Sequence, residues 1–151
     1  MTKKSVYFIL FLSFWGLTQI TAQELSLASN SEVTTQHQVT IKGNLVAYSA
    51  TTGTQPVWGE DGKEIAYLHY TYYKRNGLKS YDERPLLISF NGGPGSASVW
   101  MHLAYTGPRI LNIDDEGYPV QPYGFKENPY SVLDVCDIIY VNPVNTGYSR
   151  T

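Results

Sequence analysis

A glycine-rich turn directly after an apolar run constrains this chain more than any other stretch. The run occupies residues 86–90, and the turn after it reads N-G-G-P-G at residues 91–95. Because glycine and proline are unfavourable inside helices and strands, this composition predicts a sharp turn where the backbone comes close to another group. Residues 96–103 predict a short helix, whose first N–H groups would suit an anion or an oxyanion. We therefore place the candidate site at this turn.

Charge and length limit the possible classes of protein. The 151 residues include 11 Lys and Arg against 13 Asp and Glu, for a net charge of −2. Binding to nucleic acid requires clustered positive charge, so no nucleic-acid partner is expected. The length is sufficient for one domain, whereas α/β enzymes often have roughly 200–250 residues. The length therefore favours an incomplete α/β domain.

The first 23 residues predict a signal peptide. Lys3 and Lys4 form a basic region, residues 6–15 are apolar, and residues 21–23 offer small side chains near a cleavage point. The apolar stretch is too short for a spanning helix with flanks, and a retained membrane anchor is the alternative. We expect a secreted or periplasmic protein with no other membrane segment, and a polar linker at residues 24–35.

Four strands are expected after this linker. Residues 38–48 alternate apolar and polar side chains, and residues 64–74 are rich in tyrosine, which predicts two antiparallel amphipathic strands. Residues 50–63 contain several glycines and a proline and predict a loop or hairpin connection. Residues 84–90 and 135–141 are nearly continuously apolar, which is typical of strands covered on both faces. The order predicts an α/β sheet with two antiparallel edge strands followed by two buried central strands.

Shorter signals complete the prediction. Gly107 and Pro108 are expected to end the helix. Residues 114–117 read as a solvated hairpin tip rather than a metal site, and no metal or cofactor is expected. Residues 129–133 predict one helical turn. Cys136, the only cysteine, lies in an apolar run and is expected to be a small buried hydrophobe rather than a catalytic thiol.

No complete hydrolytic site is visible in the sequence. A serine hydrolase needs a nucleophile, a base and an orienting acid besides its oxyanion donors. No G-x-S-x-G elbow occurs, and no histidine follows His102 to complete the order Ser, Asp, His. His37, His69 and His102 are expected to be structural or surface residues. Ser96 and Ser98 are expected to begin the helix.

Four sequence blocks together resemble the serine carboxypeptidases. They read N-G-G-P-G-S-A-S at residues 91–98, G-P at 107–108, N-P-Y-S at 128–131 and P-V-N-T-G-Y-S at 143–149. The first block alone is less specific, because proline iminopeptidases carry a similar H-G-G-P-G. The resemblance implies an incomplete α/β-hydrolase domain at residues 36–151. It also implies a serine-type carboxypeptidase, which releases C-terminal residues from peptides with a free C-terminus through a Ser-Asp-His triad.

The resemblance implies roles for three residues of the turn. Gly93 would give a backbone N–H to the oxyanion hole, while Asn91 and the backbone of Gly92 would hold the C-terminal carboxylate of the substrate. The family's nucleophilic serine lies in a G-E-S-Y-A-G block that is absent from this sequence. We therefore expect no catalytic residue in this chain, a triad beyond Thr151, and an N-terminal fragment that is inactive alone.

Five departures from the family pattern indicate a divergent, bacterial-type member. Ser89, Ser96 and Tyr105 stand where many members have tryptophan, cysteine and glutamate, and Asn142 and Asn145 also depart from the common pattern. Two alternative functions stay open. One is another α/β-hydrolase, such as an aminopeptidase or esterase, and the other is a secreted, non-catalytic peptide-binding module.

The resemblance also bears on solubility. In α/β-hydrolases the third strand pairs with the fifth, which is missing from these residues. The strand at residues 84–90 is therefore expected to have an open apolar edge, and the isolated chain to be poorly soluble or partly folded.

Overall fold

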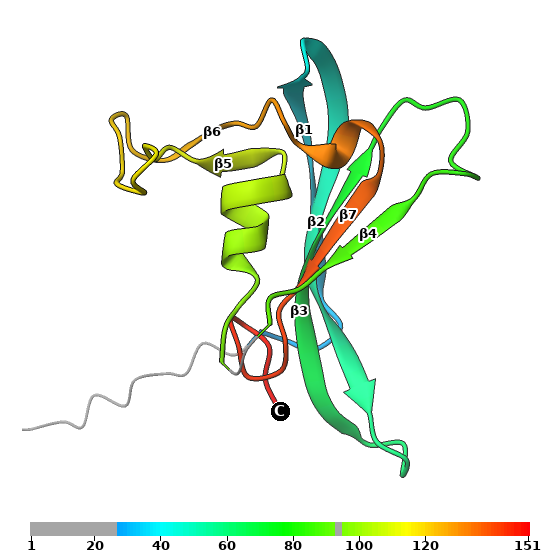
Figure 1. Cartoon of the computed structure of the whole chain (residues 1–151). Helices are drawn as coiled ribbons and strands as arrows, with labels where there is room; N and C mark the ends of the chain where they lie inside the picture. The colour runs from blue at the N-terminus through cyan, green and yellow to red at the C-terminus, as the bar shows by residue number, and fades with distance from the viewer. Residues whose placement is uncertain (1–26, 93–94) are drawn as a thin grey trace, which may run out of the picture.

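The computed structural model describes residues 27–92 and 95–151, so the predicted signal peptide at 1–23 lies outside the described residues. Five strands form one sheet in the order β1-β2-β3-β7-β4 (Figure 1). Three successive pairs are antiparallel: β1 (Glu32–Ile41) with β2 (Asn44–Trp58), β2 with β3 (Glu64–Arg75), and β3 with β7 (Asp137–Val141). The fifth, β4 (Leu86–Ser89), is parallel to β7. This mixed sheet is consistent with the predicted α/β class.

The hairpin of β1 and β2 corrects the prediction of a single strand at residues 38–48. The two strands are joined by Lys42 and Gly43, which both have positive φ, 48° and 80°. Positive φ at both central residues is the mark of a type I′ hairpin turn, for which Asn-Gly and Asp-Gly are the usual sequence signals. Because a lysine stands at the first of these positions, the sequence lacks the usual signal for this turn. β1 also begins at Glu32, so the end of the predicted 24–35 linker belongs to a strand.

The length of β2 contradicts the predicted loop at residues 50–63. β2 continues to Trp58, although β1 accompanies it only as far as Gly53. The Thr54 N–H still donates to the Ser31 carbonyl oxygen (2.8 Å), but beyond it no described strand pairs with that side of β2. Pro56, which has no backbone N–H, is therefore tolerated within the strand. The connection to β3 is confined to residues 59–63.

The core lies on one face of the sheet. Its buried side chains come from β1, β2, β7 and the 3-10 helix η2 (Val132–Asp134): Val39, Ile41, Val46, Tyr48, Leu133, Ile138 and Tyr140. The helical turn predicted at residues 129–133 thus occurs slightly later, as η2. Cys136 packs half-buried against this cluster with its Sγ 3.4 Å from the Val132 carbonyl oxygen, which agrees with a role as a small hydrophobe.

The two strands that were predicted to be buried differ in the structure. β7 lies between β3 and β4, and most of its side chains are buried. β4 is the last strand of the sheet, and Leu86 and Ile88 are 53% and 59% exposed. Within the described residues no strand pairs with the outer side of β4. The open apolar edge predicted for residues 84–90 is therefore confirmed, whereas the predicted burial of that strand is wrong for this chain.

A short helix and a projecting hairpin separate β4 from β7. The π-helix η1 (Met101–Thr106) ends at Gly107, as predicted, and a Cβ at Gly107 would collide with the His102 carbonyl oxygen. β5 (Arg109–Leu111) and β6 (Phe125–Glu127) pair in an antiparallel hairpin that extends away from the sheet (Figure 1). The Gly117 N–H donates to the Asp114 carbonyl oxygen (3.1 Å) at its tip, which confirms the predicted turn. Across residues 27–92 and 95–151, the structure holds no helix with the length and apolarity needed to cross a bilayer.

Candidate functional site

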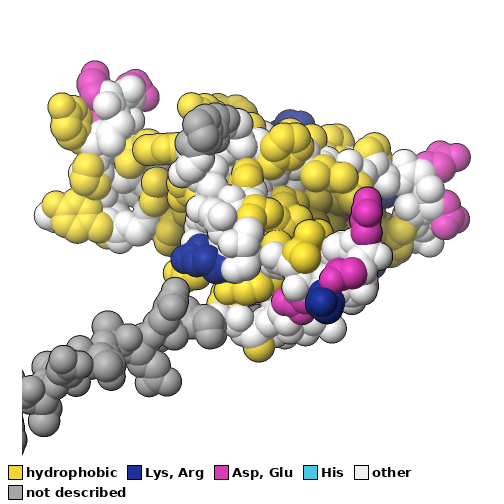
Figure 2. Space-filling view, turned by 90° about the horizontal axis from the view of Figure 1, so that it is seen from below, with side chains coloured by type: hydrophobic (Ala, Val, Ile, Leu, Met, Phe, Trp, Pro, Cys, Tyr) yellow, Lys and Arg dark blue, Asp and Glu magenta, His cyan; other side chains and the backbone are white. Residues whose placement is uncertain are grey.

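The candidate site lies at the carboxyl ends of the parallel strands β4 and β7. The loop at residues 90–98 follows β4, the loop at residues 142–149 follows β7, and the parallel pairing brings both to the same end of the sheet. This end is where ligands bind in open α/β sheets. Figure 2, which views the molecule from this end, shows hydrophobic and uncharged groups over much of the face, with acidic side chains at its left and right ends, acidic and basic side chains together at the lower right, and a basic group left of centre.

Ser98 ties the first loop to the end of β7. Its side chain is buried, and its hydroxyl accepts the Asn91 backbone N–H (3.0 Å) and donates to the Val141 carbonyl oxygen. The Ser98 carbonyl oxygen accepts the His102 N–H (3.0 Å), so Ser98 does lie where the helix begins. Its hydroxyl, however, does not cap the helix but hydrogen-bonds to the last residue of β7, which links the loop to that strand. Ser98 is therefore a fixed point of the candidate site.

The turn presents Asn91 and Gly92 beside this fixed point. Asn91 is half-buried, and one N–H of its side-chain amide donates to the Ser96 hydroxyl (2.6 Å). Within the described residues the second N–H of this amide has no acceptor. Gly92 is exposed, and no described atom lies within 4 Å of the position that a Cβ would occupy, so its backbone is open to a ligand. Gly93, the expected oxyanion donor, lies outside the described residues.

Asn142, the first residue after β7, connects the two loops to β3. Its Oδ1 accepts the Ser98 backbone N–H (3.0 Å), and its Nδ2 lies 3.1 Å from Nδ1 of His69. The backbone N–H of Asn142 donates to the His69 carbonyl oxygen (2.9 Å), which continues the pairing of β7 with β3. One amide side chain thus contacts both the β4 loop and the neighbouring strand.

The loop after β7 holds Asn142 in place from its other sides. Gly147 has a φ of 52°, and a Cβ there would lie 2.5 Å from Asn142 Nδ2, so a glycine is required. The buried Ser149 donates its hydroxyl hydrogen to the Asn142 carbonyl oxygen (2.7 Å) and accepts the His69 N–H (2.8 Å). These contacts leave the amide of Asn142 little freedom to rotate.

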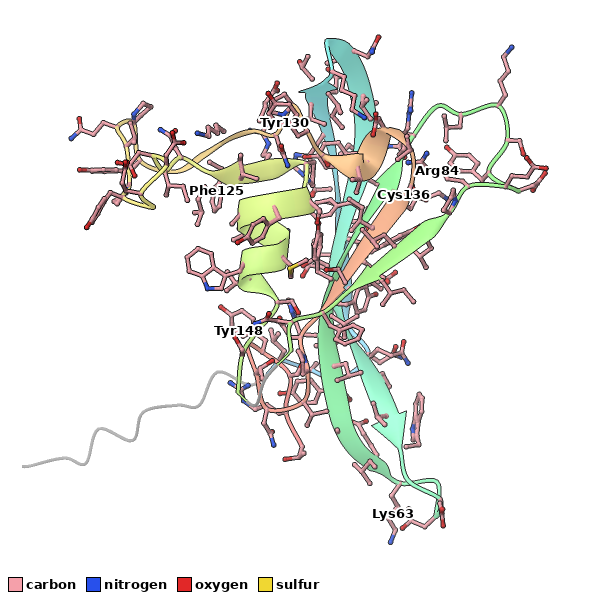
Figure 3. All side chains as sticks on the ribbon, in the orientation of Figure 1. Lys63, Arg84, Phe125, Tyr130, Cys136 and Tyr148 are labelled. Atoms are coloured by element: carbon pink, nitrogen blue, oxygen red, sulfur yellow. The ribbon has the colours of Figure 1, made fainter. Side chains whose placement is uncertain are left out.

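A hollow of about 260 Å³ lies between these elements, and aromatic side chains form much of its wall. The side chains that line it include His69, Thr71, His102, Tyr140 and Tyr148. Figure 3 shows Tyr148 near the foot of η1, at the opposite end of the β4–β7 pair from Arg84. An uncharged hollow beside an exposed glycine backbone could accept an apolar side chain of a peptide.

His102 has a structural role in this hollow. Its Nε2 hydrogen-bonds the Tyr73 hydroxyl, and its ring stacks on Tyr140 with centroids 4.5 Å apart. Burial lowers the pKa of His102 to about 4 and raises the pKa of Tyr140 to about 12, so both side chains are neutral near pH 7. This packing supports the expectation that His102 is not a catalytic base.

The histidines of the described residues do not form a serine–histidine pair. His37 contacts Thr35, His69 contacts Thr52 and Asn142, and His102 contacts Tyr73. Nor do the described residues contain a group of three or more His, Cys, Asp and Glu side chains that could hold a metal ion. The polar side chains at this end of the described sheet are instead mainly amides, hydroxyls and aromatic rings.

Sequence reasoning found the turn but missed Asn142, His69, Gly147 and Ser149 as its supports. Asn142 and Ser149 stand at the two ends of the loop that follows the apolar strand β7, and the sequence does mark that loop. His69 carries no such signal, because its contact with Asn142 joins positions 73 residues apart and depends on the register of β3 with β7.

Comparison with known proteins agrees with this geometry. A family model described as serine carboxypeptidase matches residues 45–151. The match contains the whole candidate site, from the turn after β4 to the loop after β7.

Three curated relatives illustrate the similarity. Carboxypeptidase Y homolog A of Pyrenophora tritici-repentis is 30% identical over 91 residues, which is 60% of this chain and 15% of the relative. Serine carboxypeptidase ctsa-3.1 of Caenorhabditis elegans is 35% identical over 69 residues, 45% of this chain and 11% of the relative. Serine carboxypeptidase-like 7 of Arabidopsis thaliana is 37% identical over 83 residues, 53% of this chain and 18% of the relative.

The chain spans less than a fifth of the length of these relatives, from 11% to 18%. The family match nevertheless covers well over half of the chain, and the blocks at residues 91–98 and 143–149 lie within it. The chain therefore belongs to the serine carboxypeptidase family.

Proposed function

We propose that this chain supplies the substrate-holding part of a secreted or periplasmic serine-type carboxypeptidase with an α/β-hydrolase fold. Its substrate would be a peptide with a free C-terminus. The turn at residues 91–95 would bind the reacting end of that peptide, while the nucleophile, acid and base would come from outside these 151 residues. The observation that carries the proposal is the place of Asn91 and Gly92 at the carboxyl end of a parallel strand, inside the region that matches the family.

The free hydrogen-bond donor of Asn91 supports a carboxylate site. Of the two amide N–H groups of Asn91, the Ser96 hydroxyl accepts one, and within the described residues the other has no acceptor. The neighbouring backbone of Gly92 is exposed. Hydrogen bonds to a charged acceptor stabilise a complex more than neutral ones do, so two donors suit a carboxylate. Asn91 and Gly92 would therefore fix the C-terminal carboxylate of the peptide.

The oxyanion role is assigned to the backbone N–H of Gly93. In acyl transfer the scissile carbonyl oxygen gains negative charge when the nucleophile adds, and a preorganised N–H stabilises that charge. Removal of one such donor typically costs about 2.7–4 kcal/mol of transition-state stabilisation. Gly93 follows the carboxylate-binding pair directly, so the scissile carbonyl, one residue from the C-terminus, would lie close to its N–H.

The chain alone should not hydrolyse peptides. It contains no G-x-S-x-G elbow, and within the described residues no histidine side chain hydrogen-bonds a serine hydroxyl. An N-blocked peptide incubated with the 151-residue chain should therefore keep its C-terminal residue, as followed by mass spectrometry. Steady trimming by the purified chain would contradict the assignment of the triad to other residues.

The source of the triad can be tested on the coding DNA. We expect the reading frame after Thr151 to encode a G-E-S-Y-A-G block, followed by the Asp and the His. The longer product should release C-terminal residues from a peptide acid and leave the corresponding peptide amide intact. Preference for a free amino terminus, or cleavage of esters without peptide trimming, would instead favour another α/β-hydrolase.

A further inference from the structure

A continuous series of hydrogen bonds runs from β3 to the candidate carboxylate site. His69 on β3 contacts the Asn142 amide (3.1 Å), and Asn142 accepts the Ser98 backbone N–H (3.0 Å). The Ser98 hydroxyl then accepts the Asn91 backbone N–H (3.0 Å). The first two steps join different segments of the fold, and the last lies within the loop at residues 90–98, so the position of Asn91 depends on a histidine that lies outside both loops.

The chemistry of the partners fixes the orientation of the Asn142 amide. A backbone N–H can only donate, so the Asn142 atom facing Ser98 must be the oxygen. The amide nitrogen then faces Nδ1 of His69 and donates to it. His69 Nδ1 must accept, which requires an unprotonated nitrogen and places the ring hydrogen on Nε2.

The other side of the His69 ring agrees with this tautomer. Nε2 lies 3.1 Å from the Thr52 hydroxyl oxygen, and the Thr52 hydroxyl donates in turn to the Tyr70 carbonyl oxygen (3.2 Å). Since the Thr52 hydrogen is used there, its oxygen is free to accept the Nε2–H of His69. Neutral His69 with the hydrogen on Nε2 therefore satisfies every contact.

We propose that His69 is a positioning residue whose unprotonated Nδ1 orients Asn142, which in turn holds Ser98 and Asn91 in their binding geometry. Protonation of Nδ1 would bring two donors together between His69 and Asn142. Rotation of the amide would only move the conflict to the Ser98 N–H. Only the final step, carboxylate binding at Asn91, rests on the proposed function.

The surroundings of His69 contain few charges that could offset this conflict. The titratable groups that line the hollows around His69 or contact its ring are Glu32 of β1, His102 of η1, Tyr140 of β7 and Tyr148 of the last loop. The guanidinium of Arg150 donates to the Gly147 and Ser149 carbonyl oxygens. Burial lowers the pKa of His69, and His102 is itself neutral near pH 7 because burial depresses its pKa to about 4. His69 is thus held neutral by its environment and by its partners alike.

Nuclear magnetic resonance of the 151-residue chain tests the positioning role directly. At about pH 7.5 the ring nitrogens of His69 should show the Nε2–H tautomer. On acidification, the His69 ring and the backbone amides of Ser98 and Asn91 should change with one shared midpoint, below the ordinary 6.5 of histidine. An Nδ1–H tautomer, or a Ser98 amide that stays unchanged while His69 titrates, would overturn the proposal.

Two variants separate positioning from simple packing. His69→Asn keeps an acceptor near the place of Nδ1 and cannot titrate, so the Ser98 amide should stay protected from hydrogen exchange and lose its pH dependence. His69→Phe keeps a ring without an acceptor, so exchange at Ser98 should accelerate roughly fivefold to tenfold, as expected for one lost hydrogen bond. His37→Asn, at an exposed histidine away from the loops, is the matched control and should behave as the wild type. Equal behaviour of the Asn and Phe variants would indicate packing alone and overturn the proposal.

A peptide titration separates this proposal from the proposed function. An N-blocked peptide acid should bind the wild-type chain more weakly at a pH just below the His69 midpoint found by nuclear magnetic resonance than at about pH 7.5. Its α-carboxylate, with an ordinary pKa of about 3.3–3.7, titrates well below the ordinary range of histidine. His69→Asn should remove most of that difference, and an unchanged difference would overturn the role of His69 in binding. If neither the wild type nor His69→Asn prefers the acid over the amide at either pH, the proposed carboxylate site is wrong. The titration and hydrogen exchange of the Ser98 backbone amide then still test the role of His69.

Discussion

The two ends of the β4–β7 strand pair are built from different chemistry. At the amino ends, Arg84 Nε and Asp137 Oδ1 form an ion pair at 2.7 Å, with side chains only 9% and 10% exposed. At the carboxyl ends, Asn91, Ser98 and Asn142 join the loops through neutral amides, a hydroxyl and backbone groups. The charged amino end therefore stabilises the sheet, whereas the neutral carboxyl end has the groups that we propose bind a ligand.

The ion pair at the charged end has further hydrogen-bond partners. Asp137 also accepts the Arg75 backbone N–H (3.0 Å) and the Tyr72 hydroxyl (3.2 Å), and Arg84 Nη2 donates to the Leu133 carbonyl oxygen (2.7 Å). At the neutral end, the Asn91 amide keeps one N–H without an acceptor among the described residues. Polar groups that are already satisfied stabilise the fold, whereas an unused donor beside an exposed backbone suits a ligand.

The largest expected effect comes from breaking the charged end. Asp137→Ala leaves the Arg84 guanidinium buried without its partner, which should lower the free energy of unfolding by about 3–5 kcal/mol. Urea denaturation followed by circular dichroism measures the change. Lys63→Ala, which breaks the exposed Lys63–Asp61 pair, is the matched control and should cost less than about 1 kcal/mol. Similar losses in both variants would show that the buried pair does not fix the strands.

The neutral end should make the fold sensitive to acid. Burial lowers the pKa of His102 from 6.5 to about 4, so the folded state binds fewer protons than the unfolded chain between these values. Stability should therefore be complete above about pH 6.5 and fall by up to about 3 kcal/mol as the pH decreases toward 4. His102→Gln should flatten this dependence in urea titrations, while His37→Gln, at an exposed position, should not. An unchanged slope in His102→Gln would contradict the account.

The smallest effect on stability concerns the free side of β4. Ile88 is 59% exposed on this edge strand, where unpaired backbone groups invite association with another chain. Ile88→Lys should change the free energy of unfolding little and shift the chain toward monomer in sedimentation velocity. Ile65→Lys is a control with a similarly exposed isoleucine (55%) away from β4. A wild-type chain that is already a soluble monomer with a sharp cooperative melt would refute the aggregation liability.

The parts of the fold that the sequence predicts carry local signals. The apolar run of β7 and the Gly107 stop of η1 each specify their own conformation, and the structure has both. The β1–β2 hairpin was not predictable, because a lysine stands at the first positive-φ position of its turn.

Contacts between distant residues were beyond local reasoning. The Arg84–Asp137 and His69–Asn142 pairs depend on strand register, which no short sequence pattern reveals. The exposure of β4 could not be predicted either, because an apolar run indicates a strand that is suited to burial, whereas its burial depends on which other strands and helices pack against it. For the candidate site, the sequence therefore identifies the turn at 91–95 but not the residues that hold it.

The central claim is that Asn91 recognises the C-terminal carboxylate of a peptide, and an affinity ratio tests it most directly. Titration calorimetry with an N-blocked peptide acid and its amide should show at least about tenfold tighter binding of the acid to the wild-type chain. Asn91→Ala should bring that ratio close to one, while Asn44→Ala, at an exposed asparagine far from the turn, should leave it unchanged. An acid preference that persists in Asn91→Ala, or equal binding of acid and amide by the wild type, would contradict the claim.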